Sequence, residues 1–293
     1  AMLTCFEDSI ETGKLDRAAF KFRHRLLGHP SLSLENLGRV LPALPKSQVM
    51  FSKSRLANGD DFETTFRSRP RDQSIEQTIE NIRSSASYIM VQAPEVDASF
   101  ADLRRDMQAD VEKLMELRGI GGAAMDAKLY LFIAPPNAIT PFHIDRYSTF
   151  LLQFSGSKTV TVFPQWEERV VSAPDREAYV AYDRTQLPWT DDLNMLGTSF
   201  DFRPGDALHI PFVAGHHVRN GPEDVSISMS IIFNTRESMA WRRAICFNHR
   251  MRKHLAGLGM QPAPVGRSMW RDQAKSAMYR TGSRVLRMIG RDG

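Results

Sequence analysis

Two short segments of this 293-residue chain carry metal-binding side chain types at a spacing that suits one shared site. The first is Thr140-Pro-Phe-His-Ile-Asp145, in which His143 and Asp145 lie two residues apart. Side chains two apart on a strand point to the same side, so this imidazole and carboxylate can reach one centre together. Two imidazoles and one carboxylate on one face of an iron ion leave three positions open for a cosubstrate and oxygen. A lone His-X-Asp pair arises often by chance, so a second histidine is needed.

The second segment, residues 204–218, supplies a histidine 71 residues after Asp145. Its Pro204-Gly-Asp sequence predicts a tight turn, and Ala207–Ile210 reads as a strand that Pro211 ends. A short loop then delivers His216. The two segments together are far more specific than either one alone. The alternative interpretation is that both histidines are hydrogen-bonded interior residues and that Asp145 is a turn residue.

The interval around these segments has the two-residue period of β-strands. Eight short strands broken by proline and glycine predict a closed or sandwiched all-β core. The polar and aromatic stretch from 165 to 197 is predicted to be a long loop over one mouth of this barrel. The expected strands are 128–134, 139–144, 149–154, 159–163, 199–202, 207–210, 216–219 and 225–233.

The flanking regions carry apolar residues at helical spacing. Helices are expected at 33–44, where Pro42 and Pro45 end the pattern, at 74–83 and at 98–118, with short strands at 48–51 and 88–91. Two further helices are expected at 238–258 and 268–289. We therefore expect a mixed α/β N-terminal region, residues 1–125, that packs on the core; a β core at 126–235; and a helical C-terminal extension at 236–293. The predicted fold class is mainly β with flanking helices.

At these motifs the chain resembles the JmjC and cupin-like branch of the 2-oxoglutarate oxygenases, which includes the asparaginyl hydroxylase that inhibits hypoxia-inducible factor. The resemblance covers roughly residues 85–235 and is densest at 128–163 and 203–233. It implies a double-stranded β-helix, the jelly-roll fold of cupins and JmjC domains. It also implies that His143, Asp145 and His216 are the iron ligands, and that His217 points away from the metal.

The resemblance extends to the cosubstrate site. This family binds the distal carboxylate of 2-oxoglutarate with a lysine on the strand after the His-X-Asp motif, and Lys158 occupies that place. Thr140 and Tyr88 match the family's hydroxyl donors to the same carboxylate. Thr149 and Ser230 stand where the asparaginyl hydroxylase has asparagines near the other end of the cosubstrate. The simpler alternatives are a solvated hairpin lysine at 158 and an ordinary core tyrosine at 88.

The activity that the resemblance implies needs Fe(II), 2-oxoglutarate and O2. It couples decarboxylation of 2-oxoglutarate to succinate with hydroxylation of a C–H bond, and a protein or peptide side chain is the expected substrate. One alternative is a hydroxylase of a small biosynthetic intermediate. Another is a cupin-like binding or regulatory protein without turnover, against which the intact triad and Lys158 argue.

The charge of the chain is divided unevenly. Residues 235–293 hold 13 Lys/Arg and 3 Asp/Glu, whereas residues 1–234 hold 25 and 31, so the basic character belongs to the C-terminal extension. Helices that follow the barrel in this family often form a dimer interface, and apolar residues such as Trp241, Met269 and Trp270 suit one. We therefore expect a homodimer through these helices. Binding of a nucleic acid is less favoured, because no nucleic-acid motif is present.

Composition narrows the remaining classes of protein. The two cysteines, Cys5 and Cys246, are too few for a disulfide framework or a cysteine-ligated metal site, and fit a reducing compartment. No apolar run approaches the ~20 residues of a membrane-spanning helix. Acidic residues interrupt any secretory-signal pattern near the N-terminus. A cytoplasmic protein with no membrane association is the expectation.

Overall fold

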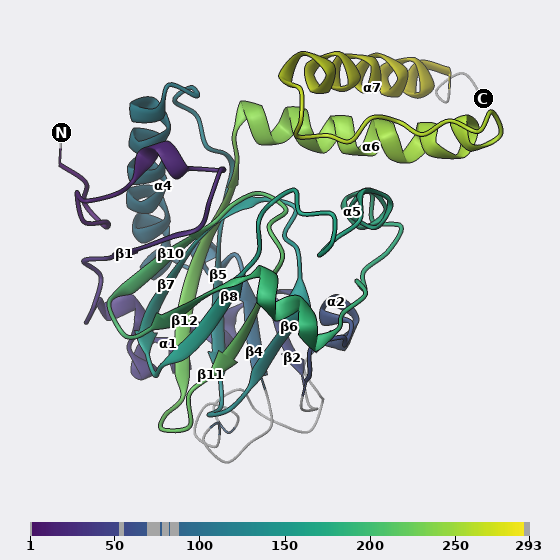
Figure 1. Ribbon diagram of the computed structural model, residues 1–293. Helices are drawn as coiled ribbons and strands as arrows, with labels where there is room; N and C mark the ends of the chain where they lie inside the picture. The colour runs from purple at the N-terminus through teal and green to yellow at the C-terminus, as the bar shows by residue number, and fades with distance from the viewer. Residues whose placement is uncertain (1, 53–55, 69–76, 78–81, 83–87, 290–293) are drawn as a thin grey trace.

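The computed structural model describes residues 2–52, 56–68, 77, 82 and 88–289 (Figure 1). Its centre is two facing antiparallel sheets. The first includes the order β10 (Asp206–Ile210), β7 (Ser148–Ser155), β12 (Ser226–Asn234) and β5 (Met125–Ala134). The second has the order β6 (Ile139–His143), β11 (His216–Asn220), β8 (Lys158–Val162) and β9 (Thr198–Phe202). From β5 to β12 successive strands alternate between the two sheets, except that β8 and β9 pair with each other in the second sheet. This topology is a double-stranded β-helix, so the expected fold class is confirmed.

Apolar side chains from both sheets meet between them. Leu151 and Leu208 of the first sheet and Val160 and Val218 of the second belong to one buried cluster. Along β11, Val218 lies between two less buried residues, as the two-residue period of a strand requires. The eight strands expected from the sequence are all present, with ends that differ by at most three residues.

Four N-terminal strands extend the first sheet to eight. On one edge β1 (Phe20–Arg23) pairs with β10, and on the other β4 (Tyr88–Gln92) pairs with β5, followed by β2 (Val49–Ser52) and β3 (Arg67–Ser68). Strands β2 and β4 were expected, but β1 and β3 were not, because runs of four and two residues carry too little periodic signal. The helix expected at 74–83 lies outside the described residues apart from Gln77, which is helical, and Ile82, which is buried.

Helices cover the outer face and the ends of the barrel. The α-helices before the core are α1 (Leu34–Ala43), α2 (Phe62–Thr65) and α4 (Ala98–Arg118), and the 3₁₀ turns are η1 (Thr12–Lys14), η2 (Pro30–Leu32), η3 (Lys46–Gln48) and η4 (Pro94–Val96). Helix α4 buries Phe100, Leu103 and Met107 in the largest apolar cluster, together with side chains of the first sheet. It ends at Gly119, whose φ of 79° is the left-handed conformation that glycine adopts without strain. Pro42 lies inside the last turn of α1 instead of ending it.

The segment 165–197 is more ordered than expected. It contains α5 (Ala173–Val180) and η5 (Asp191–Leu196), so its prediction as a loop is wrong in part. Ser172 caps α5 by accepting a hydrogen bond from the backbone N–H of Asp175, and a proline stands in the first turn. Both are recognisable start signals.

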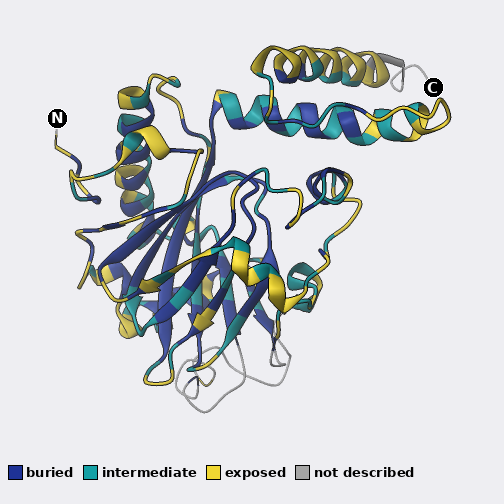
Figure 2. Ribbon diagram, in the orientation of Figure 1, coloured by how far each residue is buried: buried dark blue, intermediate teal, exposed yellow. Residues whose placement is uncertain are grey.

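The C-terminal helices form a pair at one end of the barrel (Figure 1). Helix α6 (Arg236–Ala256) buries Trp241 and Ile245 in a cluster with α5 and the loop after β10. Helix α7 (Met269–Ile289) packs on α6 and leaves much of its surface open to solvent (Figure 2). Its exposed residues include Trp270 and Met278. Both helices match the expectation from the sequence.

Two smaller observations concern the class of protein. No helix in the described part of the chain is long and apolar enough to cross a membrane. Cys5 and Cys246 are both free thiols.

Candidate metal centre and its cavity

Strands β6 and β11 bring the three predicted metal ligands together. His143 is the last residue of β6 and lies directly opposite His216, the first residue of β11. The pairing of these strands shifts register just after His216, an irregularity of the kind that re-aims a side chain beside a site. Asp145 follows two residues beyond β6. One Asp145 oxygen lies 3.6 Å from His143 Nε2 and the other 3.4 Å from His216 Nε2.

The two imidazoles present their Nε2 atoms to this point. Nδ1 of His143 donates to the carbonyl of Pro141 at 2.7 Å, and Nδ1 of His216 donates to the carbonyl of Ala214 at 2.9 Å. Because a carbonyl can only accept, the proton of each neutral ring is on Nδ1 and the Nε2 lone pair is free. Burial, followed by the proximity of His216, lowers the pKa of His143 to about 4. The His143 ring is therefore neutral at pH 7, as a metal ligand must be.

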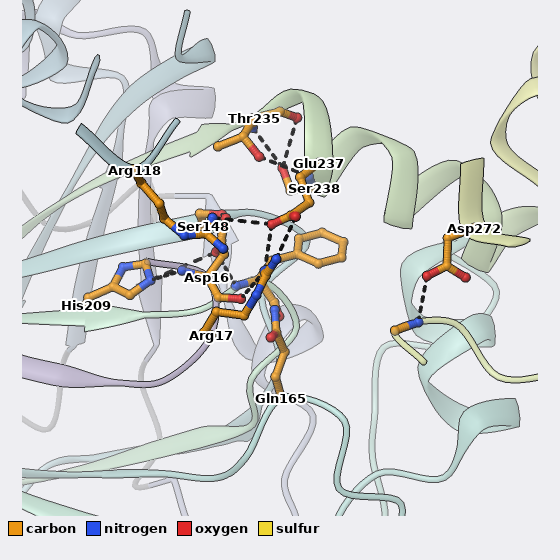
Figure 3. A network of polar contacts seen from close by, with 12 residues as sticks. Asp16, Arg17, Arg118, Ser148, Gln165, His209, Thr235, Glu237, Ser238 and Asp272 are labelled. Atoms are coloured by element: carbon orange, nitrogen blue, oxygen red, sulfur yellow. Dashed lines mark hydrogen bonds and ion pairs between the residues drawn. The ribbon is translucent and has the colours of Figure 1, made fainter. Parts of the chain in front are cut away.

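The loop that precedes His216 is held by a hydrogen bond to Asp16, which Figure 3 shows beside Ser148 and His209. Buried Asp16 accepts a hydrogen bond from the N–H of Phe212 at 3.0 Å and one from the Ser148 hydroxyl at 2.7 Å. The next residue, Val213, has a φ of 56°, a strained conformation for a β-branched side chain, and its N–H donates to the carbonyl of Asp145 at 3.2 Å. These bonds fix the distance between two of the three ligands. Burial raises the pKa of Asp16.

The same network attaches helix α6 to this part of the barrel. Arg17, next to Asp16, forms a bidentate pair with Glu237 in the first turn of α6, at 2.6 and 2.7 Å. Arg118 at the end of α4 reaches the same carboxylate at 3.5 Å. Figure 3 shows this chain of contacts from His209 to Glu237. The start of α6 is thereby fixed relative to the loop before His216.

A cavity of about 400 Å³ opens from the triad into the barrel. Lys158 lines it and is 92% buried, with Nζ donating to the hydroxyl of Ser228 at 2.9 Å. Burial lowers the pKa of Lys158 to about 7, and no acidic side chain of the described chain offsets that effect. An ammonium group in this position is matched to an anion that the protein itself does not provide.

The remaining predicted residues line the same cavity. The hydroxyl groups of Tyr88 and Thr140 lie 3.0 Å apart in a hydrogen bond, on the wall that also includes Lys158. Thr149 and Ser230 are buried and line it as well. The Thr149 hydroxyl has no hydrogen-bond partner among the described residues, as expected of a group that hydrogen-bonds to a polar ligand when one is bound. The structure therefore brings all eight predicted site residues to one cavity.

Four further histidine and tryptophan residues near the site lie outside the cavity. His217 points away from the triad and contacts Asn194 Oδ1 at 2.7 Å, as predicted. His209 is fully buried between backbone partners, with Nε2 accepting from the N–H of Asp16 and Nδ1 donating to the carbonyl of Thr149. Trp166 packs on Trp241, and Trp189 packs on Phe142. All four have packing roles.

The structure adds residues that sequence reasoning missed, and it places Arg146, the alternative to Lys158 as an anion anchor, beside them. Phe62 of α2 stacks on the ring of His143 with centroids 4.3 Å apart and planes at 24°. Arg146 lies between the rings of Tyr179 and Tyr182, donates to the carbonyl of Tyr179, and pairs with Glu63. All of these residues line the cavity. No sequence pattern around Phe62 and Glu63 indicates that they lie at this site. The capping residue Ser172, by contrast, could have predicted helix α5, on which Tyr179 lies.

The arrangement has a definite chemical capacity. The triad presents two imidazole lone pairs and a carboxylate within 4.8 Å of one another, and a ligand set of this kind on one side of a divalent ion leaves the other side open. The buried ammonium of Lys158 lies in the same cavity with two hydroxyl groups. The donor set therefore fits a divalent metal with a neighbouring carboxylate-bearing ligand.

Comparison with known proteins agrees with this description of the fold. The sequence profile of the family described as "Cupin-like domain" matches residues 42–239. No curated protein matches the sequence. Two structures of the Escherichia coli protein YcfD are similar: one at a TM-score of 0.52 and 15% identity, covering 95% of this chain and 69% of that chain. The other, described as a ribosomal oxygenase, has a TM-score of 0.50 and 13% identity, covering 96% and 68%.

A further YcfD structure, in complex with cobalt and 2-oxoglutarate, has a TM-score of 0.49 and 15% identity, covering 92% of this chain and 63% of that chain. The chain therefore spans between 63% and 69% of the length of these structures. Similarity at this level of identity concerns the fold.

Proposed function

The chain belongs to the family of cupin-like domains, and on that premise we propose that it is an Fe(II)- and 2-oxoglutarate-dependent oxygenase. The observation that carries the proposal is the joint presence of the triad and Lys158 in one cavity. A metal site alone would fit many cupins. A buried, unpaired ammonium beside it adds the feature that a dicarboxylate cosubstrate needs.

The roles of the residues follow from their chemistry. His143 and His216 would hold iron through Nε2, and Asp145 through its carboxylate. Lys158 would bind the distal carboxylate of 2-oxoglutarate, with the hydroxyl groups of Tyr88 and Thr140 as further donors. When bound, iron and 2-oxoglutarate reduce O2, so that one oxygen atom enters the succinate formed with CO2 and the other enters a substrate C–H bond.

The protein contributes position and exclusion of water. The Nδ1 bonds of both histidines to backbone carbonyls fix the ring orientations, which limits the reorganisation that metal binding requires. The wall of the cavity keeps Lys158 from water, so its attraction to a carboxylate is stronger than at a surface. Thr149 and Ser230 would lie beside the cosubstrate and complete its polar surroundings.

A polypeptide side chain is the substrate class that we propose. The resemblance to the asparaginyl hydroxylase and the fold similarity to a protein described as a ribosomal oxygenase support it. The cavity lining includes Tyr130, Tyr147 and Tyr182, whose rings and hydroxyl groups suit an aliphatic side chain and its backbone. A small-molecule substrate is the second candidate. We further propose a cytoplasmic homodimer that associates through α7, whose exposed Trp270 and Met278 supply apolar surface.

The test is a turnover screen with Fe(II), 2-oxoglutarate and O2 in which succinate is measured against peptide pools and metabolite pools. The proposal predicts succinate in stoichiometric excess over enzyme with at least one peptide pool, and none with the Asp145→Ala variant. Turnover with metabolite pools alone would move the substrate to the second candidate. Metal binding with no succinate from any pool would favour a non-catalytic binding protein.

A further inference from the structure

A second cavity lies between α6 and α7, at the start of β5 and away from the triad. We call it the α6–α7 groove, and its volume is about 360 Å³. Three arginines line it, Arg236 and Arg243 from α6 and Arg280 from α7. Met125 and Met239 give it an apolar wall. None of its lining residues lines the cavity of the metal centre.

The three arginines lack acidic partners. None of them forms an ion pair or a hydrogen bond with a side chain in the described part of the chain, and no acidic residue lines the groove. Two arginines around these helices do have acidic partners: Arg252 binds Glu177 at 2.7 Å, and Arg17 binds Glu237 at 2.6 Å. The groove thus gathers, around one volume, three arginines that have no ion pair in the described part of the chain.

The fold holds these like charges near one another. Burial, together with the positive charge of Arg280, lowers the pKa of Arg243. Two guanidinium groups that line one groove without a counter-ion repel each other, and an anion between them would remove that repulsion. The arrangement therefore stabilises the complex with an anion relative to the empty groove.

Regular helical spacing builds the groove. Arg236 and Arg243 lie seven residues apart on α6, and Gln273 and Arg280 lie seven residues apart on α7, so each pair occupies one face of its helix. The two faces meet across the groove, which therefore belongs to a packed helix pair instead of a loop. Exposed Trp270 and Met278 of α7 do not line the groove.

We propose that the α6–α7 groove binds a small organic phosphate of about the size of a nucleotide. A phosphate monoester carries nearly two negative charges and three acceptor oxygens, which suits three guanidinium groups that line one groove better than a single carboxylate does. The methionine wall takes the less polar part of the ligand, and Gln273 offers hydrogen bonds. A volume of this size falls in the range of small-molecule sites.

The test measures binding to the full-length chain by calorimetry at constant salt, with phosphate, AMP, ATP and a ten-nucleotide single strand as probes. We expect AMP or ATP to bind with one site per chain, and the double variant Arg243→Gln/Arg280→Gln to weaken that binding at least tenfold. The matched control is Arg284→Gln, which removes the same charge one helical turn beyond Arg280 on an exposed position. It should leave the affinity unchanged.

The variants themselves should fold, because removing unpaired charges relieves repulsion; their thermal midpoint should equal or exceed that of the wild type. Absence of binding by phosphate, AMP and ATP at millimolar concentration would overturn the proposal. Equal losses in the double variant and in Arg284→Gln would also overturn it, since they would indicate a general polycation. Preference for the single strand over AMP and ATP would assign the groove to nucleic acid instead.

Discussion

Lys158 should destabilise the protein when no ligand is bound, and its replacement tests this directly. We choose Lys158→Met, which keeps the unbranched chain and removes the charge. Burial lowers the pKa of Lys158 from the ordinary 10.5 to about 7. One pKa unit corresponds to ~1.4 kcal/mol, so the charged form is destabilised in the fold by an amount on the order of a few kcal/mol.

The sign of the pH dependence follows from the direction of that shift. Because the pKa is lower in the folded than in the unfolded state, the folded state binds fewer protons between pH of about 7 and 10.5. The stability of the wild type therefore rises with pH over that window, and the penalty is complete below pH 7. Without metal or 2-oxoglutarate, Lys158→Met should be more stable than the wild type at pH 6, and the gain should shrink as the pH rises above 7.

Two assays measure the opposing effects. Urea unfolding at pH 6 and pH 9 gives the stability difference, with Lys128→Met, a half-buried strand lysine away from the cavity, as the control. A binding titration gives the affinity for 2-oxoglutarate, which should fall at least tenfold in Lys158→Met, because truncating one partner of a buried charge pair costs roughly 2–5 kcal/mol. A variant that is less stable at pH 6, or that binds 2-oxoglutarate as tightly as the wild type, would refute this reasoning. Arg146 would then be the next anchor to test.

Three further predictions concern other parts of the account. Asp16→Ala should lower the free energy of unfolding by about 2–4 kcal/mol in urea titrations, because it leaves the N–H of Phe212 and the Ser148 hydroxyl buried without partners. A loss under 1 kcal/mol would contradict the role of Asp16 in holding the loop before His216. Tyr88→Phe should weaken 2-oxoglutarate binding roughly tenfold in calorimetry and leave the metal affinity unchanged, because it removes one hydrogen bond to a charged group. An unchanged 2-oxoglutarate affinity would make Tyr88 a core residue. By light scattering, the full-length chain should be a dimer at both ~0.1 and ~0.5 M salt. Ending the chain at Arg267 removes α7 and should give a monomer. A full-length chain that is monomeric at both salt concentrations would refute the dimer.

The barrel could be predicted because its information is local. Strands such as β7 and β12 carry long apolar runs, and the turns between strands carry proline and glycine. The strand pattern and the turn residues therefore indicate the same strand boundaries. That the two ligand segments form one metal site could also be predicted, because His143 and His216 each lie at the end of a strand that the sequence indicates. Helix α4 was predicted with both ends correct, since Asp97 caps it and Gly119 ends it.

What could not be predicted depends on contacts between distant segments. β1 is only four residues long and exists because it pairs with β10, almost 190 residues later. Phe62 reaches His143 through the packing of α2 on β6, for which no sequence pattern exists. The network of Asp16 with Phe212 and Ser148 likewise joins three segments that lie far apart in sequence. That the groove arginines form no ion pair in the described part of the chain is visible only once its acidic residues have been placed.

The most direct test of the central claim is metal stoichiometry. Mn(II) or Fe(II) titrated anaerobically into the purified chain should bind at one ion per chain in the wild type and in His217→Ala, whose imidazole points away from the triad. The double variant His143→Ala/Asp145→Ala should keep its fold by circular dichroism and bind no ion at that site. One ion per chain in the double variant, at the wild-type affinity, would show that His143, Asp145 and His216 do not form the metal centre.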